Sequence, residues 1–549
     1  MIKKNFLFIL FFLLLFIPLG DLIHSGLPIT HDGQDHVARI ANFYQNLQEG
    51  VVIPRWAGNL NWGYGHPILM FLYPLPSYFA SFFHFLGFSF VDSTKIVFGL
   101  AYIFSGIAMY LFVSNLLGRR EAVVSALLYV YAPYRFVDLY VRGAIGEHVA
   151  FIFPPLVLYC FLKLSRDKKN RLLYQVIGSL SLAGLILSHN AISLMFLPLI
   201  FFYASYEIFS AKERKKTLVS YCLLFIFGFG ISCFFWAPAF FEGKYTLREK
   251  LTAGSHRLSF STFDKFVYGA WSYGGTGLLS VQVGLMQWLF VLVVSFLTIL
   301  KIIKRDRMTY LSVVLVVIFF LSLFLMTEKS SFIWEKITIL QKFQFPWRFL
   351  SLNVFVSALI GGLGVSLFPF LKKTIPFSLI IFGIIFLSHS YWHAKGFTNR
   401  PESFYSSIYK GTTDTGESSP IWSVRFMEKG SRTHAEIISG NAKINEIERS
   451  FTVHGYQIIA QGKTRILENT LYFPGWNIYV DGKEVASQFQ DSRYRGLITF
   501  FVEKGEHQIS VKFQETKLRL IADIASFAML VILIFSIILT QRPLWRRFL

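Results

Sequence analysis

The sequence predicts a polytopic α-helical membrane protein of about twelve spans, with a β domain outside the membrane before the last span. Of its 549 residues, 54% are hydrophobic and 15% are charged, whereas an ordinary soluble domain is about 25% charged. Apolar runs of near-spanning length recur along the chain, and basic residues fill the gaps between them. These features exclude disordered and disulfide-framework classes, since the three cysteines all lie inside apolar runs.

The position of the positive charge indicates membrane orientation rather than a nucleic-acid partner. The net charge is +21, and most of it lies in short gaps such as 163–171, 212–216 and 301–307. Basic clusters of this kind are typical of cytoplasmic loops. We therefore expect a protein of a prokaryotic plasma membrane, with both termini on the cytoplasmic side. We also expect contact with membrane lipids and no binding of nucleic acid.

Each predicted span is an apolar run between polar gaps. The spans are 5–20, 94–115, 120–134, 148–164, 172–188, 191–209, 217–240, 281–300, 309–326, 349–367, 375–393 and 519–540. The first resembles a signal peptide, but no small-residue cleavage site follows it, which favours an uncleaved anchor. Residues 66–88 are also apolar, but Pro67, Pro74 and Pro76 disfavour a straight helix. We expect that segment to lie at the outer interface or to be re-entrant.

The expected domains are a transmembrane domain at 1–393, a β domain at 394–518, and a final span with a basic tail at 519–549. The transmembrane domain carries two outer loops, 21–93 and 134–148. Period-two alternation at 451–459, 498–502 and 509–513 predicts half-buried strands in the β domain. Asp-Gly at 481–482 and Lys-Gly at 504–505 predict turns. A sandwich is the expected form, with Trp476 and Tyr494 as candidates for acceptor contact or for the core.

Ionisable groups near a bilayer are costly and tend to be functional, so the acids of the outer loops are candidate catalytic residues. Asp35 follows the first span, beside His31 and His36, and could act as a general base or hold a cation. Asp32 precedes Gly33 and the start of an apolar pattern, which favours a helix N-cap over catalysis. A divalent metal (Mg, Mn or Zn) at Asp35, His36 and Glu147 has suitable residue types, but no metal-ligand spacing supports it.

Three arginines face the same compartment as these acids. Arg135 and Arg142 lie in the second outer loop, and Arg348 precedes a later span. Arginine binds phosphate in bidentate fashion, which makes a phosphate clamp a candidate role. The alternative is that these side chains reach the lipid headgroups. His189-Asn190, between two spans, is equally compatible with a polar turn and with a functional site.

Several stretches together resemble a known group of enzymes. They are HDGQDHVARI (31–40), PRWAGNLNWGYGHPILMFLYPLPSY (54–78), APYRFVDLYVRGAIGEHVAF (132–151), LSHNAISLMFLPLI (187–200), FWAPAFFE (235–242), QFPWRFL (344–350) and YFPGWNIYVDGK (472–483). With an uncleaved first span and a proline-rich interfacial helix, they resemble the GT-C superfamily of glycosyltransferases. Within it, the chain is most similar to the membrane proteins called 6-pyruvoyl-tetrahydropterin synthase-related and to their YfhO-like relatives.

The resemblance implies roles for particular residues. The first-loop acid of the superfamily corresponds to Asp35, or less securely to Asp32, and the second-loop acid to Glu147, preceded by Arg142. Some relatives carry a donor-phosphate lysine where this chain has His66. The chain shows no cluster of three metal ligands of the kind that pterin synthases use.

The resemblance also implies a function. It is transfer of a sugar from a polyprenyl-phosphate or polyprenyl-diphosphate donor to an extracytoplasmic glycan, lipid or protein acceptor, in assembly of a cell-envelope glycan or glycoprotein. The alternatives are a transporter or flippase of lipid-linked precursors and an envelope-assembly binding module. Against a carrier, the later spans contain few acids, and no paired broken spans indicate inverted repeats.

Overall fold

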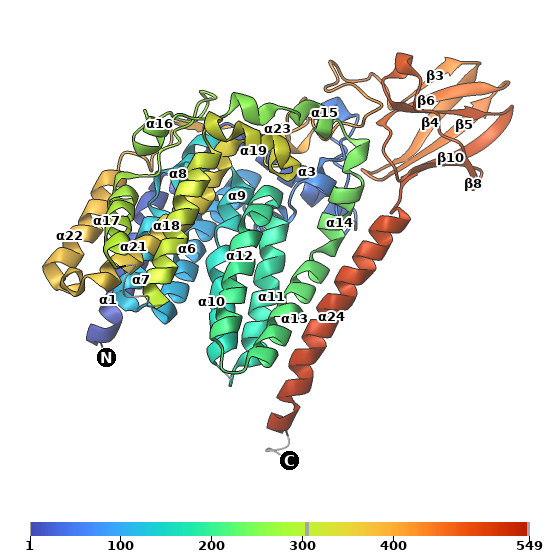
Figure 1. Ribbon diagram of the computed structural model, residues 1–549. Coiled ribbons are helices and arrows are strands. Elements are labelled where there is room, and N and C mark those ends of the chain that lie inside the picture. Colours follow the sequence, from blue (N-terminus) through green and yellow to red (C-terminus); the bar gives the residue numbers. More distant parts are fainter. Residues whose placement is uncertain (1, 168, 302–306, 546–549) are drawn as a thin grey trace.

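The chain folds into a helical bundle, a layer of short helices on one side of it, and a β domain beside that layer (Figure 1). The structure is a computed structural model that describes residues 2–167, 169–301 and 307–545. Most of the predicted basic loop 301–307 lies outside the described residues. Figure 1 places both ends of the described chain on the side of the bundle away from the β domain.

Six helical segments of the described chain are long and apolar enough to cross a membrane. They are α6 (Phe90–Leu116), α9 with α10 (Ile145–Arg166), α11 (Arg171–Ser188), α12 (Asn190–Ser210), η8 with α21 (Pro346–Leu367) and the first part of α24 (Lys517–Trp545). Each overlaps a predicted span. The chain is therefore helical with several apolar candidate spans, as the sequence predicts.

Three further predicted spans are bent pairs of helices, which raise the count to nine if each pair is one span. They are α7 (Arg119–Val130) with Pro133–Arg142, bent by 48°; α13 (Arg214–Ile231) with α14 (Cys233–Phe241), bent by 67°; and Thr309–Leu325 of α18 (Arg307–Leu325) with Glu328–Lys336, bent by 95°. Three predicted spans are shorter apolar helices, within Leu7–Ile23, Leu285–Leu300 and Thr374–Ser388. The expected count of twelve holds only if these short helices also cross.

The segment 66–88 is not a single straight helix, as its prolines predict. It forms α4 (Ile68–Phe71) and α5 (Leu75–Phe85), separated by a break that contains Pro74. α5 packs against α3 (Gly33–Gln48), and other short helices lie at the same end of the bundle (Figure 1). They include α15 (Arg248–Thr252), α16 (Phe263–Val267), α19 (Ser331–Lys336), α20 (Thr338–Gln341) and α23 (Glu402–Ser406).

The β domain consists of two antiparallel sheets. The strands are β3 (Ala435–Ser439), β4 (Ala442–Arg449), β5 (Val453–Ala460), β6 (Thr464–Leu471), β7 (Trp476–Val480), β8 (Lys483–Val485), β9 (Leu497–Val502) and β10 (Gly505–Phe513). One sheet has the order β4-β5-β10-β7-β8 and the other β3-β6-β9. The three predicted strands correspond to β5, β9 and β10. The predicted Asp481-Gly482 turn joins β7 to β8, with positive φ angles at both residues.

The core of the β domain extends into the first outer loop. Trp56, Tyr64, Met70 and Phe71 belong to the same buried cluster as the inward residues of both sheets. Trp56 packs edge-on against Trp476, with ring centroids 5.4 Å apart. Trp476 is 2% exposed, so it is a core residue and is not available to an acceptor.

The segment before the sheets is irregular and runs back over the bundle. The strands of the two β-domain sheets begin at Ala435, whereas the sequence predicts a β domain from residue 394. In between, β2 (Phe397–Thr398) pairs with β1 (Leu27–Pro28). Residues 409–420, which we call the strap, follow α23. The strap lies against the first outer loop, where Tyr409 N donates to Asn59 O at 2.8 Å and Trp62 N donates to Tyr409 O at 3.0 Å.

Candidate active site

The start of α3 is fixed against the second outer loop. The backbone N–H groups of His31 and Asp32 donate to the carbonyls of Val141 (3.0 Å) and Arg142 (2.8 Å). Arg142 ends a short π-helix, η3 (Val137–Arg142), an element that is often found at functional sites. The two outer loops predicted to carry the chemistry are therefore in direct contact.

Asp32 occupies the N-cap position of α3, but its side chain does not cap the helix. Instead the hydroxyl of Thr30 accepts a hydrogen bond from Gly33 N at 3.1 Å. The expected capping role of the Asp32 carboxylate is therefore wrong. Asp32 is exposed, and its carboxylate is a second free acid at the start of α3.

Asp35 lies in the first turn of α3 and is half-buried. Its Oδ1 accepts a hydrogen bond from the hydroxyl of Tyr409 at 2.8 Å. Among the described residues, Oδ2 has no hydrogen-bond partner. Burial raises the pKa of Asp35 above its usual range, although Tyr409 and Arg39 oppose the shift. A carboxylate with one oxygen held and one free is suited to accept a proton.

Arg39 lies one helical turn after Asp35 and also contacts the strap. Its Nε donates to the hydroxyl of Thr413 at 3.3 Å, and its guanidinium bonds the Thr413 carbonyl as well. A second guanidinium nitrogen lies 2.9 Å from Nδ1 of His36. Burial, reinforced by Arg39, Arg142 and His189, holds the pKa of His36 well below its usual value. The His36 ring is therefore neutral, and its Nδ1 already contacts the Arg39 guanidinium.

Glu147 is fully buried at the start of α9 (Ile145–Ala150) and is engaged on both oxygens. Oε2 lies 2.8 Å from the Arg142 guanidinium, while Oε1 accepts from Tyr134 and from Ser351, each at 2.6 Å. Asp138 Oδ1 lies 2.6 Å from the same arginine nitrogen. Glu147 therefore holds Arg142 in place and has no free oxygen for a ligand.

Two of the three predicted arginines are neighbours. The guanidinium carbon of Arg142 lies 4.5 Å from the centroid of the Trp347 ring, and that of Arg348 lies 5.9 Å from the same centroid. Arg348 donates to the carbonyl of Phe343 at 2.8 Å, and its Nε has no hydrogen-bond partner among the described residues. These two side chains could bind a phosphate together.

Arg135 and His66 lie elsewhere. Arg135 is fully buried, 4.0 Å from the ring centroid of Phe151, and donates to Ser105 at 3.1 Å. His66 is also fully buried, and its Nε2 is 3.2 Å from Oγ of Ser419 in the strap. The structure does not bring either side chain to the pair formed by Arg142 and Arg348.

The residues proposed for a metal do not fit one. No group of three or more His, Cys, Asp or Glu side chains in the described chain could hold a metal ion. The prediction of a site at Asp35, His36 and Glu147 fails because both oxygens of Glu147 are hydrogen-bonded and Arg39 lies against Nδ1 of His36. His189 caps α12 by accepting from Ile192 N at 3.3 Å, which is the polar-turn role considered for it.

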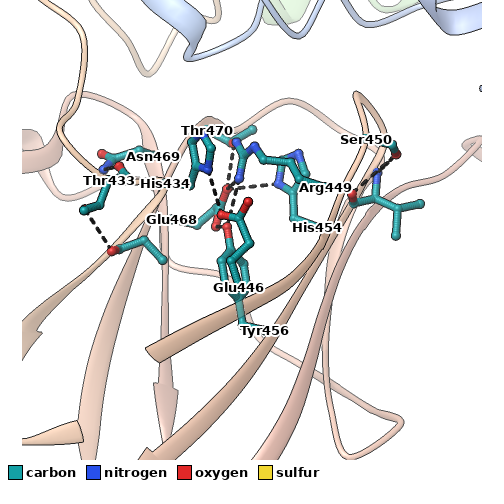
Figure 2. Close-up of polar contacts among 12 residues, drawn as sticks. Thr433, His434, Glu446, Arg449, Ser450, His454, Tyr456, Glu468, Asn469 and Thr470 are labelled. Carbon is teal, nitrogen blue, oxygen red and sulfur yellow. Dashed lines mark hydrogen bonds and ion pairs between the residues drawn. The ribbon is translucent and has the colours of Figure 1, made fainter. Parts of the chain in front are cut away.

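A second cluster of ionisable groups lies in the β domain (Figure 2). Glu468 is at its centre, in contact with Arg449, His454, Tyr456 and Thr470. Glu468 is fully buried. Burial alone would raise its pKa, but His454, Arg449 and Tyr456 lower it overall. The cluster ties β4, β5 and β6 together inside the domain and has no exposed carboxylate.

Sequence reasoning missed the strap residues Tyr409 and Thr413. Both lie 374 residues after the side chain they contact, in a stretch without regular periodicity. Their only signal in the sequence is an unusual run of polar residues between a short helix and the first strand. Tyr134 and Trp347 lay inside the quoted stretches, but nothing in the sequence indicated their partners.

Comparisons with known proteins add similarities to this geometry. No family model matches the chain, so the resemblance to the pterin-synthase-related and YfhO-like proteins stays a prediction. Over 274 residues the chain is 26% identical to an uncharacterized protein of Lactococcus lactis subsp. cremoris, which covers 48% of this chain and 43% of that protein. The chain thus matches less than half the length of this relative.

The chain is also partly similar to three solved structures. The archaeal oligosaccharyltransferase AglB from Archaeoglobus fulgidus, in complex with an inhibitory peptide and a dolichol-phosphate, has a TM-score of 0.48 at 12% identity, over 76% of this chain and 61% of that one. The arabinofuranosyltransferase AftD from mycobacteria has 0.41 at 12%, over 70% and 26%. ArnT from Cupriavidus metallidurans, bound to undecaprenyl phosphate, has 0.31 at 10%, over 66% and 77%.

Proposed function

We propose that this protein is a membrane glycosyltransferase that moves a sugar from a polyprenyl-phosphate or polyprenyl-diphosphate donor to an extracytoplasmic acceptor. The acceptor is a glycan, lipid or protein in cell-envelope assembly. The observation that carries the proposal is Asp35, a half-buried carboxylate with Oδ1 held by Tyr409 and Oδ2 free. It stands in the turn that is bonded to the arginine-bearing second outer loop.

The residues have defined roles in the displacement. Asp35 takes the proton from the acceptor hydroxyl as the acceptor oxygen bonds to the anomeric carbon. The bond from that carbon to the phosphate oxygen breaks, and the electron pair leaves with the phosphate. Arg142 and Arg348 stabilise the charge of the departing phosphate. Glu147 positions Arg142 and does not touch the substrate.

The membrane setting suits such a donor. Asp35 lies on α3, which belongs to the layer of short helices on the side that carries the β domain (Figure 1). The Arg142 carbonyl is bonded to the start of that helix. A polyprenyl tail can stay among the apolar helices while its phosphate meets the arginines. With both termini cytoplasmic, this layer faces outward.

The test is a transfer assay on the full chain in membranes. Membranes with and without the protein are incubated with a panel of radiolabelled polyprenyl-phosphate sugars and an envelope fraction as acceptor. Asp35→Asn keeps the shape of the side chain but removes its basicity, and we expect transfer to fall about 10²–10⁴-fold. Asp264→Asn makes the same change at an exposed carboxylate of α16 and should leave transfer unchanged.

Protein level in the membrane is measured beside each rate. A normally inserted Asp35→Asn protein that transfers sugar at the wild-type rate would contradict the proposal. Labelled donor that crosses the membrane without transfer would favour a flippase of lipid-linked precursors.

A further inference from the structure

The geometry points to Tyr409 as a positioning residue for Asp35. Tyr409 donates its phenolic hydrogen to the Asp35 carboxylate and thereby sets which oxygen is free to take a proton. This inference rests on the proposed function for its catalytic meaning. The hydroxyl of Tyr409 lies 2.8 Å from Oδ1 of Asp35. No other hydrogen bond reaches this carboxylate among the described residues.

The hydroxyl of Tyr409 is not needed to hold the strap. The backbone of Tyr409 is already bonded in both directions to the first outer loop, through Asn59 O and Trp62 N. Asn61 N donates to Gly411 O at 2.8 Å, and Arg39 binds Thr413 further along. Loss of one hydroxyl therefore leaves the strap anchored, and the phenol is free for a different task.

The same helix face presents both contacts of the strap. Asp35 and Arg39 are four residues apart on α3, so they lie on one face one turn apart. Tyr409 binds the first and Thr413 the second. The strap therefore fixes the carboxylate and the guanidinium relative to each other, and it joins the start of the β-domain segment to the proposed base.

The charged and titratable groups around Asp35 come from two elements. Arg39 and Asp32 lie on or at the start of α3, and Tyr409 and Asp414 lie on the strap. Burial raises the pKa of Asp35, with Asp32 and Asp414 adding to the shift, while Tyr409 and Arg39 oppose it. Removal of the hydroxyl takes away a donor that favours the ionised form, so the pKa of Asp35 should rise further.

The experiment reads the protonation of Asp35 directly, without an activity assay. The purified full chain in detergent is treated with a water-soluble carbodiimide and an amine at a series of pH values, and Asp35 labelling is measured by peptide mass spectrometry. Carbodiimides react with the protonated carboxyl, so labelling falls as the pH passes the pKa. Asp35→Asn confirms the labelled position.

In Tyr409→Phe we expect the labelling midpoint to move up by about one pH unit, which is a tenfold larger protonated fraction at a fixed pH above the midpoint. Tyr405→Phe is the matched control, because Tyr405 is fully buried nearby on α23 and its hydroxyl has no partner among the described residues. A ring-fluorinated tyrosine at position 409 keeps the shape and is a stronger donor, so it should move the midpoint down. It also covers the case in which Tyr409→Phe does not fold.

An unchanged midpoint in both Tyr409 variants would overturn the inference. If sugar transfer is detected, the acid limb of its pH profile should shift upward with the labelling in Tyr409→Phe, while the rate on the high-pH plateau stays within a few-fold of wild type. If no donor is used at all, the proposed function fails, but the labelling still decides the role of Tyr409.

Discussion

Asp35 and Glu147 are both acids of the outer loops, yet their hydrogen bonds give them different capacities. Asp35 keeps one oxygen without a partner, while both oxygens of Glu147 are used by Arg142, Tyr134 and Ser351. A carboxylate that is saturated by fixed donors cannot accept a proton without breaking those bonds. At the residue scale, hydrogen-bond accounting therefore favours Asp35 as the base.

The pKa of Asp35 predicts how transfer depends on pH. Because burial raises that pKa, the proposed base would be protonated, and inactive, at pH values above the ordinary aspartate range near 3.9. We expect transfer to be full at high pH and to fall along a single-proton limb as the pH drops through the raised pKa. Initial rates across the acid range test this, with thermal unfolding at each pH as a control. A rate that stays flat down to about pH 4 would contradict the assignment.

Glu147→Gln should damage folding more than chemistry. It removes the charge that faces Arg142 inside a fully buried network, and losing one partner of a buried ion pair costs about 3–5 kcal/mol. We expect a lower melting temperature in detergent and less protein in the membrane. Glu335→Gln is the matched control, because Glu335 pairs with Arg257 where both side chains are exposed.

A Glu147→Gln protein that melts like the wild type but transfers no sugar would instead place Glu147 among the catalytic residues.

The sequence could identify these acids but not their partners. Outer-loop acids beside apolar spans are visible as an unusual cost in a membrane protein, which is why Asp32, Asp35 and Glu147 could be selected. The partner of Asp35 comes from a strap without periodicity, and the partners of Glu147 include Ser351 in the first turn of α21, 204 residues later in the chain. Such contacts depend on tertiary packing, which one sequence does not display.

At the scale of elements, apolar length predicts where helices lie but not where they bend. The run 217–240 was predicted as one span and is two helices, α13 and α14, bent by 67°. The bend lies at Ser232, between the two helices. The hydroxyl of Ser232 donates back to Gly228 O at 2.8 Å. A serine that bonds back into the preceding turn often bends a helix, but it does not break the apolar pattern that predicts the span.

The junction between α14, α24 and the β domain is a buried ionic cluster. Arg519 is fully buried, with Nε 2.7 Å from Glu242 Oε2 and a second nitrogen 2.6 Å from the Pro474 carbonyl. Arg55 from the first outer loop binds Glu515 at 2.9 Å and Asp523 at 2.5 Å. One cluster therefore joins the last helix to three other parts of the chain.

Arg519→Ala should loosen this junction. Glu242, which is 5% exposed, would lose its cation, and the expected cost is about 3–5 kcal/mol. We expect faster proteolysis between β10 and α24 and a lower melting temperature. Lys517→Ala is the matched control, because Lys517 is exposed on the first turn of the same helix. Equal proteolysis rates in the two variants would show that the cluster does not hold the junction.

At the scale of the whole molecule, the β domain and the first outer loop form one unit. The alternation of β5, β9 and β10 was readable in the sequence because period-two patterns are local. The completion of their core by Trp56, Tyr64, Met70 and Phe71 could not be predicted, because a tertiary contact with a distant segment leaves no local pattern in the sequence. An isolated fragment 400–515 lacks these four side chains, so its core would be incomplete.

The orientation of the whole molecule is the remaining prediction from the charge pattern. Basic gaps such as 212–216 should be cytoplasmic, and the layer with α3, the strap and the β domain should face outward. A reporter fused after Arg214 should be cytoplasmic, and one fused after Phe90 or Gly430 should be extracytoplasmic. The fusion at Phe90 is the most informative, because it follows α4 and α5. The break between these helices at Leu72–Pro74 makes a crossing by this segment unfavourable, since backbone groups freed from a helix need partners inside a bilayer. A cytoplasmic reporter at Phe90 would mean that 66–88 crosses, which would place Asp35 and Glu147 on opposite sides of the membrane. The structure does not allow that separation, because Asp32 is bonded to Arg142 and Arg142 is paired with Glu147.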